Sequence, residues 1–518
     1  MKKNWYVRAL LGAVALASLG IGSDAALAQA DALRVGVATL PPSRGMPHSH
    51  AGAITNYTYS AVFDFLSVAD EKGDMVPALA TAWRSVTPVK WEFDLRPNTK
   101  FSNGEVLTSA MVADVVNWYL TDEGKSTVVG RAISRLVKGA RIIDGDTVEV
   151  ETIEPNPIVP ALLFSMHVFE PKYFKDRGMD AYGLNPVGTG PFKVTKWTPE
   201  AVEMEAFTGS WRPPKLAKLT VTPIPETTAR VQALLSGQID LAPSVSIDSV
   251  KQIEAAGLKA DLSPAPYVLT WAFLSSYRDT PFKDVRVRRA ANMAINRRDM
   301  IDGLLLGKGE QATQPATSII FGYNPNVKPY AYDPDGAKKL LAEAGYPNGF
   351  EMDAVVIPGN FPADSDIYQK AAADLGKVGI KTNLRAITFA EFVKVITAPG
   401  DPKDYGKGWG EKVWAHQQDF SVDVVPDASF RMLTPWGCRR PVPFWCDAGE
   451  SALLDKSQLE FDVEKRRKIL QDLMALFHDN APALSLVQVV DVVGRSAKVQ
   501  NAQLVYRILS YDKITKTN

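Results

Sequence analysis

Apolar and polar positions alternate along several stretches of this chain. Residues 33–40, LRVGVATL, alternate as a half-buried β-strand does, and two prolines follow. The run WEFDLRP at residues 91–97 predicts another strand, and we expect a helix before it that ends ahead of Val86-Thr87-Pro88. Residues 137–152 read as two strands around the turn Asp144-Gly145-Asp146. These runs predict sheets with one face buried.

A helical period is clearest between residues 281 and 307. Asp284 can cap a helix whose apolar stripe carries Val287 and Ala291, and Asn296 with Asp299 resembles the capping box of a second helix. Gly307 stands where a helix C-terminus favours positive φ. Further helices are expected at 226–235, at 337–344 and up to residue 375, the last followed by a strand at 380–384. Strands that alternate with helices predict an α/β protein with mixed sheets.

Length and charge narrow the class of protein. A chain of 518 residues is too long for one core, so two or three domains are expected. Its hydrophobic fraction of 46% and charged fraction of 22% are ordinary for a folded protein. Lys and Arg together number 58, as do Asp and Glu, which gives no electrostatic case for binding nucleic acid or an anionic membrane.

The N-terminus has the pattern of an export signal. Lys2, Lys3 and Arg8 precede an apolar run at residues 9–20, and small residues follow up to Ala30. The apolar run is shorter than the roughly 20 residues that span a bilayer. We therefore expect cleavage after Ala30, and no cysteine follows the run to carry a lipid anchor.

Two cysteines and five histidines bear on the chemistry. Cys438 and Cys446 lie close together in WGCRRPVPFWC, and an oxidising compartment would favour a disulfide between them, whereas a metal site would need more ligands. His48 and His50 could ligate a metal, but we expect a solvated loop there instead. The motifs G-x-S-x-G and H-E-x-x-H are absent, so we expect no enzyme and no cofactor.

Several motifs together point to a known family. They are PFKDVRVRRAANMAINR at 281–297, NPVGTGPF at 185–192, ARVQALLSGQID at 229–240, the stretch from Tyr332-Asp333-Pro334 to Gly345-Tyr346, and DNAP at 479–482. In this order they resemble the extracytoplasmic solute-binding proteins of the peptide/nickel class, family 5, which serve ABC importers. The resemblance implies a two-lobed periplasmic-binding-protein fold with an extra small domain and a ligand cleft between the lobes.

The resemblance also implies domain boundaries and partners. Lobe I would comprise residues 31–57, 185–270 and 485–518, the small lobe 58–184, and lobe III 271–484. We expect a periplasmic monomer that closes on a small solute and delivers it to an ABC-type permease and its ATPase subunits. The expected solute is a short peptide or a peptide-like compound. An opine, a sugar, a nickel chelate or haem is the alternative cargo, and a secreted hydrolase is the remote alternative.

The same resemblance indicates candidate ligand-binding residues. Peptide binders of the family carry a tryptophan and, three residues later, an aspartate that pairs with the α-ammonium of the peptide. Here Trp414 and Gln417 match those positions, so either Asp419 substitutes for the aspartate or the ligand has no free amine. Simple packing of Trp414 and Trp409 is the alternative interpretation. Further candidates are His416, which would suit a metal-complex cargo, and Tyr57, Tyr267, Trp271 and Arg439.

Overall fold

The computed structural model describes residues 31–49, 55–275, 278–358, 363–396, 407–419, 425–433, 436, 438 and 445–517. The predicted signal segment, residues 1–30, lies outside the described residues, as do His50 and the candidate site residue Arg439. In the described part, no helix is both long enough and apolar enough to cross a membrane.

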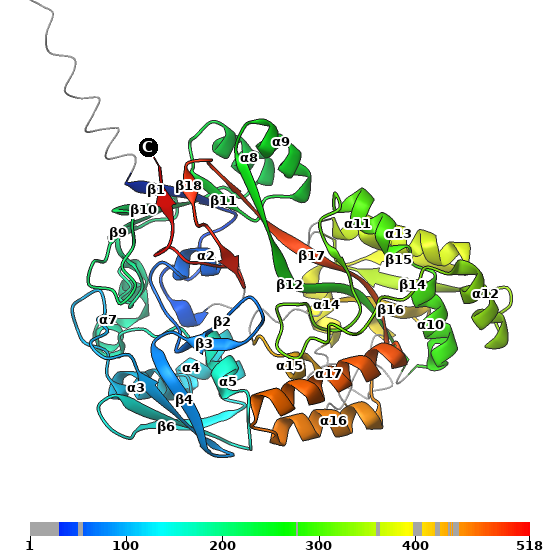
Figure 1. The fold of residues 1–518 in the computed structure, drawn as a ribbon, viewed down its shortest axis with the longest axis horizontal. Helices are drawn as coiled ribbons and strands as arrows, with labels where there is room; N and C mark the ends of the chain where they lie inside the picture. The colour runs from blue at the N-terminus through cyan, green and yellow to red at the C-terminus, as the bar shows by residue number, and fades with distance from the viewer. Residues whose placement is uncertain are drawn as a thin grey trace, which may run out of the picture.

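One large mixed sheet runs through the molecule (Figure 1). Within the described residues it has eleven strands, ten of which follow one path while β13 (Glu310–Gln311) pairs with β17 beside it. The path is β15 (Ile380–Ala386), β14 (Phe350–Val356), β16 (Val413–Asp419), β12 (Lys259–Phe273), β17 (Ala483–Arg495), β11 (Leu241–Pro243), β1 (Ala32–Val37), β10 (Lys218–Pro223), β9 (Val202–Ala206) and β8 (Phe192–Trp197).

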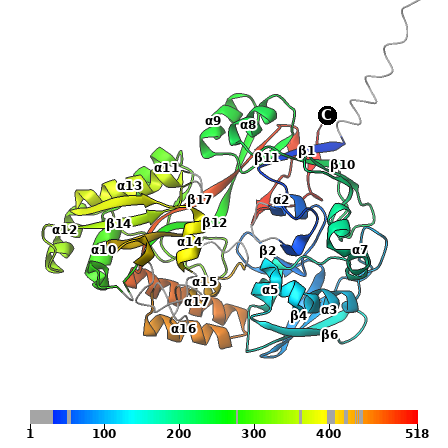
Figure 2. The ribbon, with the colours of Figure 1, turned by 180° about the vertical axis from the view of Figure 1, so that it is seen from behind.

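The long strands β12 and β17 divide the molecule into two bodies. They pair antiparallel over most of their length and lie across the middle of the molecule in both ribbon views (Figure 2). We call residues 31–258 with 496–517 the first body, and residues 274–482 the second body. Motion of one body against the other would have to bend or twist these two strands, which makes them the expected hinge.

The first body also holds a separate four-stranded antiparallel sheet. Its order is β4 (Ala80–Thr87), β5 (Lys90–Leu95), β7 (Thr147–Thr152) and β6 (Val137–Ile142). Short pairs join β2 (Ser67–Ala69) to β3 (Met75–Pro77), β18 (Val499–Gln500) to β21 (Thr515–Lys516), and β19 (Leu504–Val505) to β20 (Ile508–Leu509). The helices of this body are α2 (Asn56–Tyr59), α3 (Ser109–Trp118), α4 (Asp122–Ser126), α5 (Val128–Ile133), α6 (Val159–Leu162), α7 (Pro171–Leu184), α8 (Thr227–Leu235) and α9 (Val250–Ala255).

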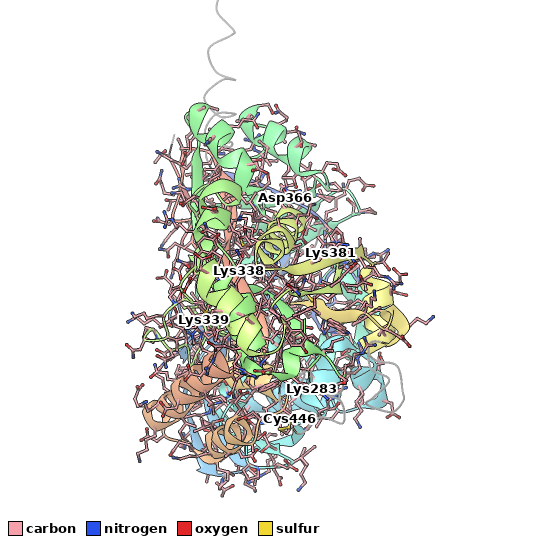
Figure 3. All side chains as sticks on the ribbon, turned by 90° about the vertical axis from the view of Figure 1, so that its right-hand side faces the viewer. Lys283, Lys338, Lys339, Asp366, Lys381 and Cys446 are labelled. Atoms are coloured by element: carbon pink, nitrogen blue, oxygen red, sulfur yellow. A yellow bond between two sulfur atoms is a disulfide. The ribbon has the colours of Figure 1, made fainter. Side chains whose placement is uncertain are left out.

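The second body packs helices around the β14–β15–β16 end of the large sheet. These are α10 (Val285–Met293), α11 (Arg297–Leu304), α12 (Pro334–Glu343), α13 (Asp364–Lys377), α14 (Phe389–Ile396), α15 (Ala428–Met432), α16 (Ala448–Leu459) and α17 (Val463–Asn480). Figure 3 looks onto this body from outside, where Lys338 and Lys339 of α12 are exposed on the side opposite buried Ala337 and Leu341. Polar residues therefore face outward as the helical period predicts.

Local sequence signals account for many of the helix ends. The Asp284 carboxylate accepts the Arg286 amide at 2.8 Å, and the Asn296 side chain accepts the Asp299 amide at 3.2 Å. Gly307 has φ +74°, and its amide donates to the Ile301 carbonyl. The predicted caps at Asp284 and Asn296 are thus confirmed, but the Asn296 amide donates to Asp374 and not to Asp299, so the reciprocal bond of a capping box is not formed. The strand predicted over residues 33–40 is present as β1 and ends at Val37.

Two expectations from the sequence were wrong. Residues 80–87 form strand β4 and not a helix, because they pair antiparallel with β5, and this long-range pairing prevails over local helix propensity. His48 is not solvated: it is fully buried among Trp118, Phe169 and Phe174, and burial lowers its pKa to about 3. The NPVGTGPF motif forms a buried turn, in which Gly188 packs against the Val62 carbonyl.

Candidate functional site

Most of the candidate ligand residues lie where β12, β16 and β17 meet. Strand β16 pairs with β12 over Leu269–Phe273, so that Trp271 is opposite Gln417 and Leu269 is opposite Asp419. On its other side Trp271 is opposite Leu484 of β17. The fold therefore brings together segments that are about 150 to 200 residues apart in the sequence, at the junction of the two bodies.

A charged group lies on the side of this junction that faces the first body. We call Tyr57, Ser244, Tyr267, Asp491 and Arg507 the cation group. The Arg507 guanidinium donates to Asp491 at 2.7 to 3.1 Å and lies 4.6 Å above the Tyr267 ring. The Tyr57 hydroxyl lies 2.9 Å from the Ser244 hydroxyl. This group joins the C-terminal hairpin, the end of β17 and helix α2.

Burial controls the protonation of the cation group. Burial raises the pKa of the Tyr57 phenol well above its ordinary value, and the nearby Asp491 carboxylate raises it further. Burial by itself would lower the pKa of Arg507, but the charge of Asp491 outweighs it and the pKa is raised. At neutral pH the Tyr57 phenol is therefore neutral and the Arg507 guanidinium is charged.

An uncharged group lies on the second body. We call Phe392, Trp409, His416 and Gln417 the aromatic group. The Phe392 and Trp409 rings stack with centroids 5.8 Å apart, and the His416 ring is 5.3 Å from Trp409 and 5.7 Å from Phe392. Burial lowers the pKa of His416 to about 4, so its imidazole is neutral at pH 7.

A backbone amide fixes the orientation of the Gln417 side chain. Its side-chain oxygen accepts the Ile357 amide at 2.6 Å, just beyond the end of β14, and the residue is 3% exposed. Since an N–H can donate only to the carbonyl end of an amide, the other end of Gln417 is its NH2 group. Gln417 therefore presents a donor at the position where the resemblance places an aspartate acceptor.

The two remaining tryptophans pack within the core of the second body. Trp271 is fully buried and stacks on Tyr368, with ring centroids 5.4 Å apart. Its indole N–H has no hydrogen-bond partner among the described residues. Trp414 is half-buried, 5.9 Å from the Phe350 ring, at a register shift between β14 and β16. The described residues include no ring contact between Trp414 and Trp409.

The remaining candidates differ in how far the structure describes them. Asp419 ends β16, and its backbone position is described without its side chain. Cys438 and Cys446 form the predicted disulfide. Among the described residues, no cluster of three or more His, Cys, Asp or Glu side chains could hold a metal ion.

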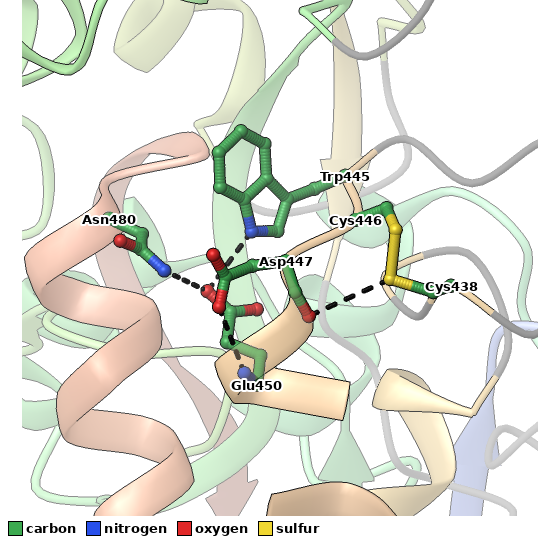
Figure 4. The surroundings of a disulfide bond; sticks show 6 residues. All are labelled: Cys438, Trp445, Cys446, Asp447, Glu450 and Asn480. Atoms are coloured by element: carbon green, nitrogen blue, oxygen red, sulfur yellow. Dashed lines mark hydrogen bonds between the residues drawn. A yellow bond between two sulfur atoms is a disulfide. The ribbon is translucent and has the colours of Figure 1, made fainter. Parts of the chain in front are cut away.

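A buried carboxyl lies beside the disulfide (Figure 4). One oxygen of Glu450 accepts from the Trp445 indole at 3.0 Å and from the Asn480 amide at 2.7 Å. Burial raises the pKa of Glu450 to about 7. Arg288 counteracts this rise, and its guanidinium lies 4.5 Å above the Trp445 ring. Glu450 of α16 thus attaches Trp445, just before Cys446 in the disulfide loop, to Asn480 of α17 through a carboxyl whose pKa lies near neutrality.

Sequence reasoning missed four members of these groups, Ser244, Phe392, Asp491 and Arg507. These residues carry no motif, because their roles come from partners elsewhere in the sequence. One signal was available: Tyr506-Arg507 falls between two short apolar pairs, LV and IL, which is the spacing of a two-residue hairpin.

Two cavities lie away from the candidate residues. One of about 310 Å³ lies between the four-stranded sheet and the start of α17, lined among others by Trp83, Trp91 and Phe461. Another of about 560 Å³ follows the C-terminal hairpin, lined among others by Asp64 and Arg212. Neither cavity is lined by the candidate ligand residues.

Comparison with known proteins agrees with the family resemblance, both in sequence and in fold. The model for bacterial extracellular solute-binding proteins, family 5 Middle, matches residues 74–425, well over half of the chain. Heme-binding protein A of Haemophilus influenzae is 29% identical over 357 residues, which are 62% of this chain and 63% of that protein. The dipeptide-binding protein of Escherichia coli K12 is 26% identical over 443 residues, 79% of this chain and 80% of that protein. The solved structure of HbpA2 from Haemophilus parasuis superposes with a TM-score of 0.80 at 22% identity, covering 94% of this chain and all of that one.

Proposed function

The chain belongs to family 5 of the bacterial extracellular solute-binding proteins, and on this premise we propose that it captures a short peptide or peptide-like compound. It is the solute-binding component of an ABC importer, with a two-lobed α/β fold. The solute would bind between the cation group and the aromatic group, and closure of the two bodies would present it to an ABC-type permease and its ATPase subunits. We further propose that the protein is an exported periplasmic monomer without enzymatic activity, and that its lobes have the boundaries expected from the sequence.

The arrangement of Gln417 carries the proposal about the solute. Because the Ile357 amide occupies its oxygen, Gln417 can offer only N–H groups to a ligand. Such a donor suits a carbonyl or carboxylate of a peptide and not an ammonium. The α-ammonium, if the solute has one, would then bind to Asp419, the next carboxylate along β16.

A pair of peptides tests this assignment. The affinity of the protein for a peptide and for its N-acetylated form is measured by isothermal titration calorimetry, with Asp419→Asn as the variant. If Asp419 binds the ammonium, either acetylation or the Asp419→Asn substitution weakens binding by roughly tenfold or more, the value of a lost charge-assisted hydrogen bond. Equal affinity for both forms in the unsubstituted protein would assign a solute without a free amine.

Haem is a second candidate cargo, because one relative is named for binding it. The aromatic group offers stacked rings and a neutral imidazole, which are the side chains expected beside a flat metal complex. A titration with haem, followed by absorbance, separates the two cargoes. A saturable spectral shift that His416→Phe abolishes would favour haem over peptide.

A further inference from the structure

The first body touches the second at a place away from the strands that join them. The landing segment, residues 319–321 of the second body, is buried against the turn between β2 and β3. Gly73 in that turn approaches it so closely that a Cβ on Gly73 would lie 2.4 Å from the Phe321 amide nitrogen and 2.5 Å from the Ile319 oxygen. Only a residue without a side chain fits between the two bodies here.

The turn is built to hold Gly73 in this position. One Asp70 oxygen accepts the amides of Lys72 at 2.8 Å and Asp74 at 3.0 Å, and the Gly73 amide donates to the Asp70 carbonyl. Gly73 has φ +79°, a conformation that side chains disfavour. The position therefore requires glycine for its backbone conformation and for its contact across the bodies.

An ion pair and a ring contact lie beside Gly73. Arg467 of α17 pairs with Asp74, and its guanidinium lies 4.4 Å above the Phe321 ring. Arg466, the neighbouring residue, forms a buried pair with Asp427 at 2.6 Å, and Asp427 makes a β-bridge with Phe321. The landing segment and α17 thus present one fixed surface to the first body.

The C-terminal hairpin reaches the same segment. The Tyr506 hydroxyl donates to the Ile319 carbonyl, and the ring is 2% exposed. Tyr506 and Arg507 form the turn of the hairpin, with φ of +50° and +58°. Two consecutive bulky residues with positive φ, in the left-handed region of backbone conformation, are uncommon. Such conformations are found where the surrounding contacts impose them.

We propose that Gly73 and Tyr506 are positioning residues for solute capture: they hold the two bodies in the closed arrangement without touching the solute. The inference rests on the proposed function, because closure matters only to a protein that encloses its ligand. Each contact exists only while the landing segment lies against the first body. Weakening these contacts therefore shifts the population from the closed to the open arrangement.

The experiment measures closure directly and needs no solute. Asp74 and Glu464 both bond to the Arg467 guanidinium, one from each body, so the double variant Asp74→Cys/Glu464→Cys places two thiols across the contact. The two native cysteines are joined in a disulfide and do not react. The rate at which a short bismaleimide joins the two introduced thiols in the full chain then reports how often the bodies meet.

Gly73→Ala is added to this double variant, and Gly104→Ala provides the matched control. Gly104 has φ +98° in another turn of the first body, and a Cβ there would meet nothing within 4 Å. Both substitutions strain a backbone with positive φ, but only Gly73→Ala forces a methyl group between the bodies. We expect Gly73→Ala to slow cross-linking by roughly tenfold relative to Gly104→Ala, the effect of overpacking a tight contact. Tyr506→Phe, which removes one hydrogen bond, should slow it a few-fold.

Equal cross-linking rates in Gly73→Ala and Gly104→Ala would overturn the proposal, as would a parent double variant that does not cross-link. Failure to bind any peptide would instead contradict the proposed function, and it would leave the cross-linking rates unchanged. A solute identified independently adds a second readout. Its affinity should fall in Gly73→Ala relative to Gly104→Ala, although the two variants have similar melting temperatures.

Discussion

The cation group, on the first body and the joining strands, and the aromatic group, on the second body, have opposite chemistry. The first holds a buried guanidinium and a buried carboxylate that satisfy each other, while the second holds stacked rings, a neutral imidazole and an amide. A buried ion pair is sensitive to loss of one partner, whereas a neutral aromatic stack is sensitive to loss of contact area or to gain of charge. The comparison teaches that the two groups depend on different physical interactions, and under the proposed function the two bodies would recognise the solute by these different means.

Removal of one charge from the cation group should have the largest effect. Asp491→Ala removes the carboxylate of β17 that pairs with the buried Arg507 guanidinium. We expect this substitution to destabilise the protein by about 3–5 kcal/mol. Chemical denaturation followed by circular dichroism measures the change. The double variant Asp491→Ala/Arg507→Leu should recover most of the loss; if it is no more stable than the single variant, the pair does not behave as an isolated buried ion pair.

Acid should act on the aromatic group through His416. Burial holds the folded-state pKa of His416 at about 4, below its ordinary 6.5, so the unfolded chain binds a proton first as the pH falls. The contribution of His416 is fully present above pH 6.5 and is lost as the pH falls towards 4, by up to about 3 kcal/mol. Melting temperatures of the wild type and of His416→Phe at pH 7.5 and pH 4.5 test this.

The difference between the variant and the wild type isolates His416. Glu450 titrates in the opposite sense, because its raised pKa weakens folding as the pH rises through about 7, and it is present in both proteins. His416→Phe should lose less stability than the wild type between pH 7.5 and pH 4.5. Parallel losses would mean that His416 binds its proton as readily in the folded protein as in the unfolded chain, so that burial does not lower its pKa.

The amide of Gln417 should have a smaller effect. Gln417→Leu removes the acceptor of the Ile357 amide and leaves that buried N–H without a partner, which costs about 1–3 kcal/mol. Gln417→Glu keeps an acceptor and serves as the matched control for hydrogen bonding. Hydrogen exchange at the Ile357 amide should accelerate in Gln417→Leu, and unchanged exchange would contradict the bond.

The hydroxyl of Tyr57 should matter least. Tyr57→Phe keeps the buried ring and removes only the hydrogen bond to Ser244, so the free energy of unfolding should fall by about 1 kcal/mol. Ser244→Ala should give a similar change, and a double-mutant cycle measures the coupling between the two hydroxyls. A coupling near zero would show that the two hydroxyls do not stabilise each other.

Features that depend on neighbouring residues could be predicted from the sequence. The caps at Asp284 and Asn296, the glycine at 307 and the disulfide follow from short patterns. Features that depend on distant partners could not be predicted. The local pattern of residues 80–87 favours a helix, but these residues form a strand because they pair with β5. No local pattern indicates that Asp491 pairs with Arg507. The candidate strand β16 was found by resemblance, but the Ile357 amide that orients Gln417 lies 60 residues away.

The most direct test of the central claim is to identify the solute that the protein retains. The protein is purified from its native host, denatured, and the released small molecules are identified by mass spectrometry. We predict a short peptide or a peptide-like compound, and that compound should raise the melting temperature when it is added back. Release of haem, a metal chelate or a sugar would contradict this account, as would a protein that retains no compound and is not stabilised by any di- or tripeptide.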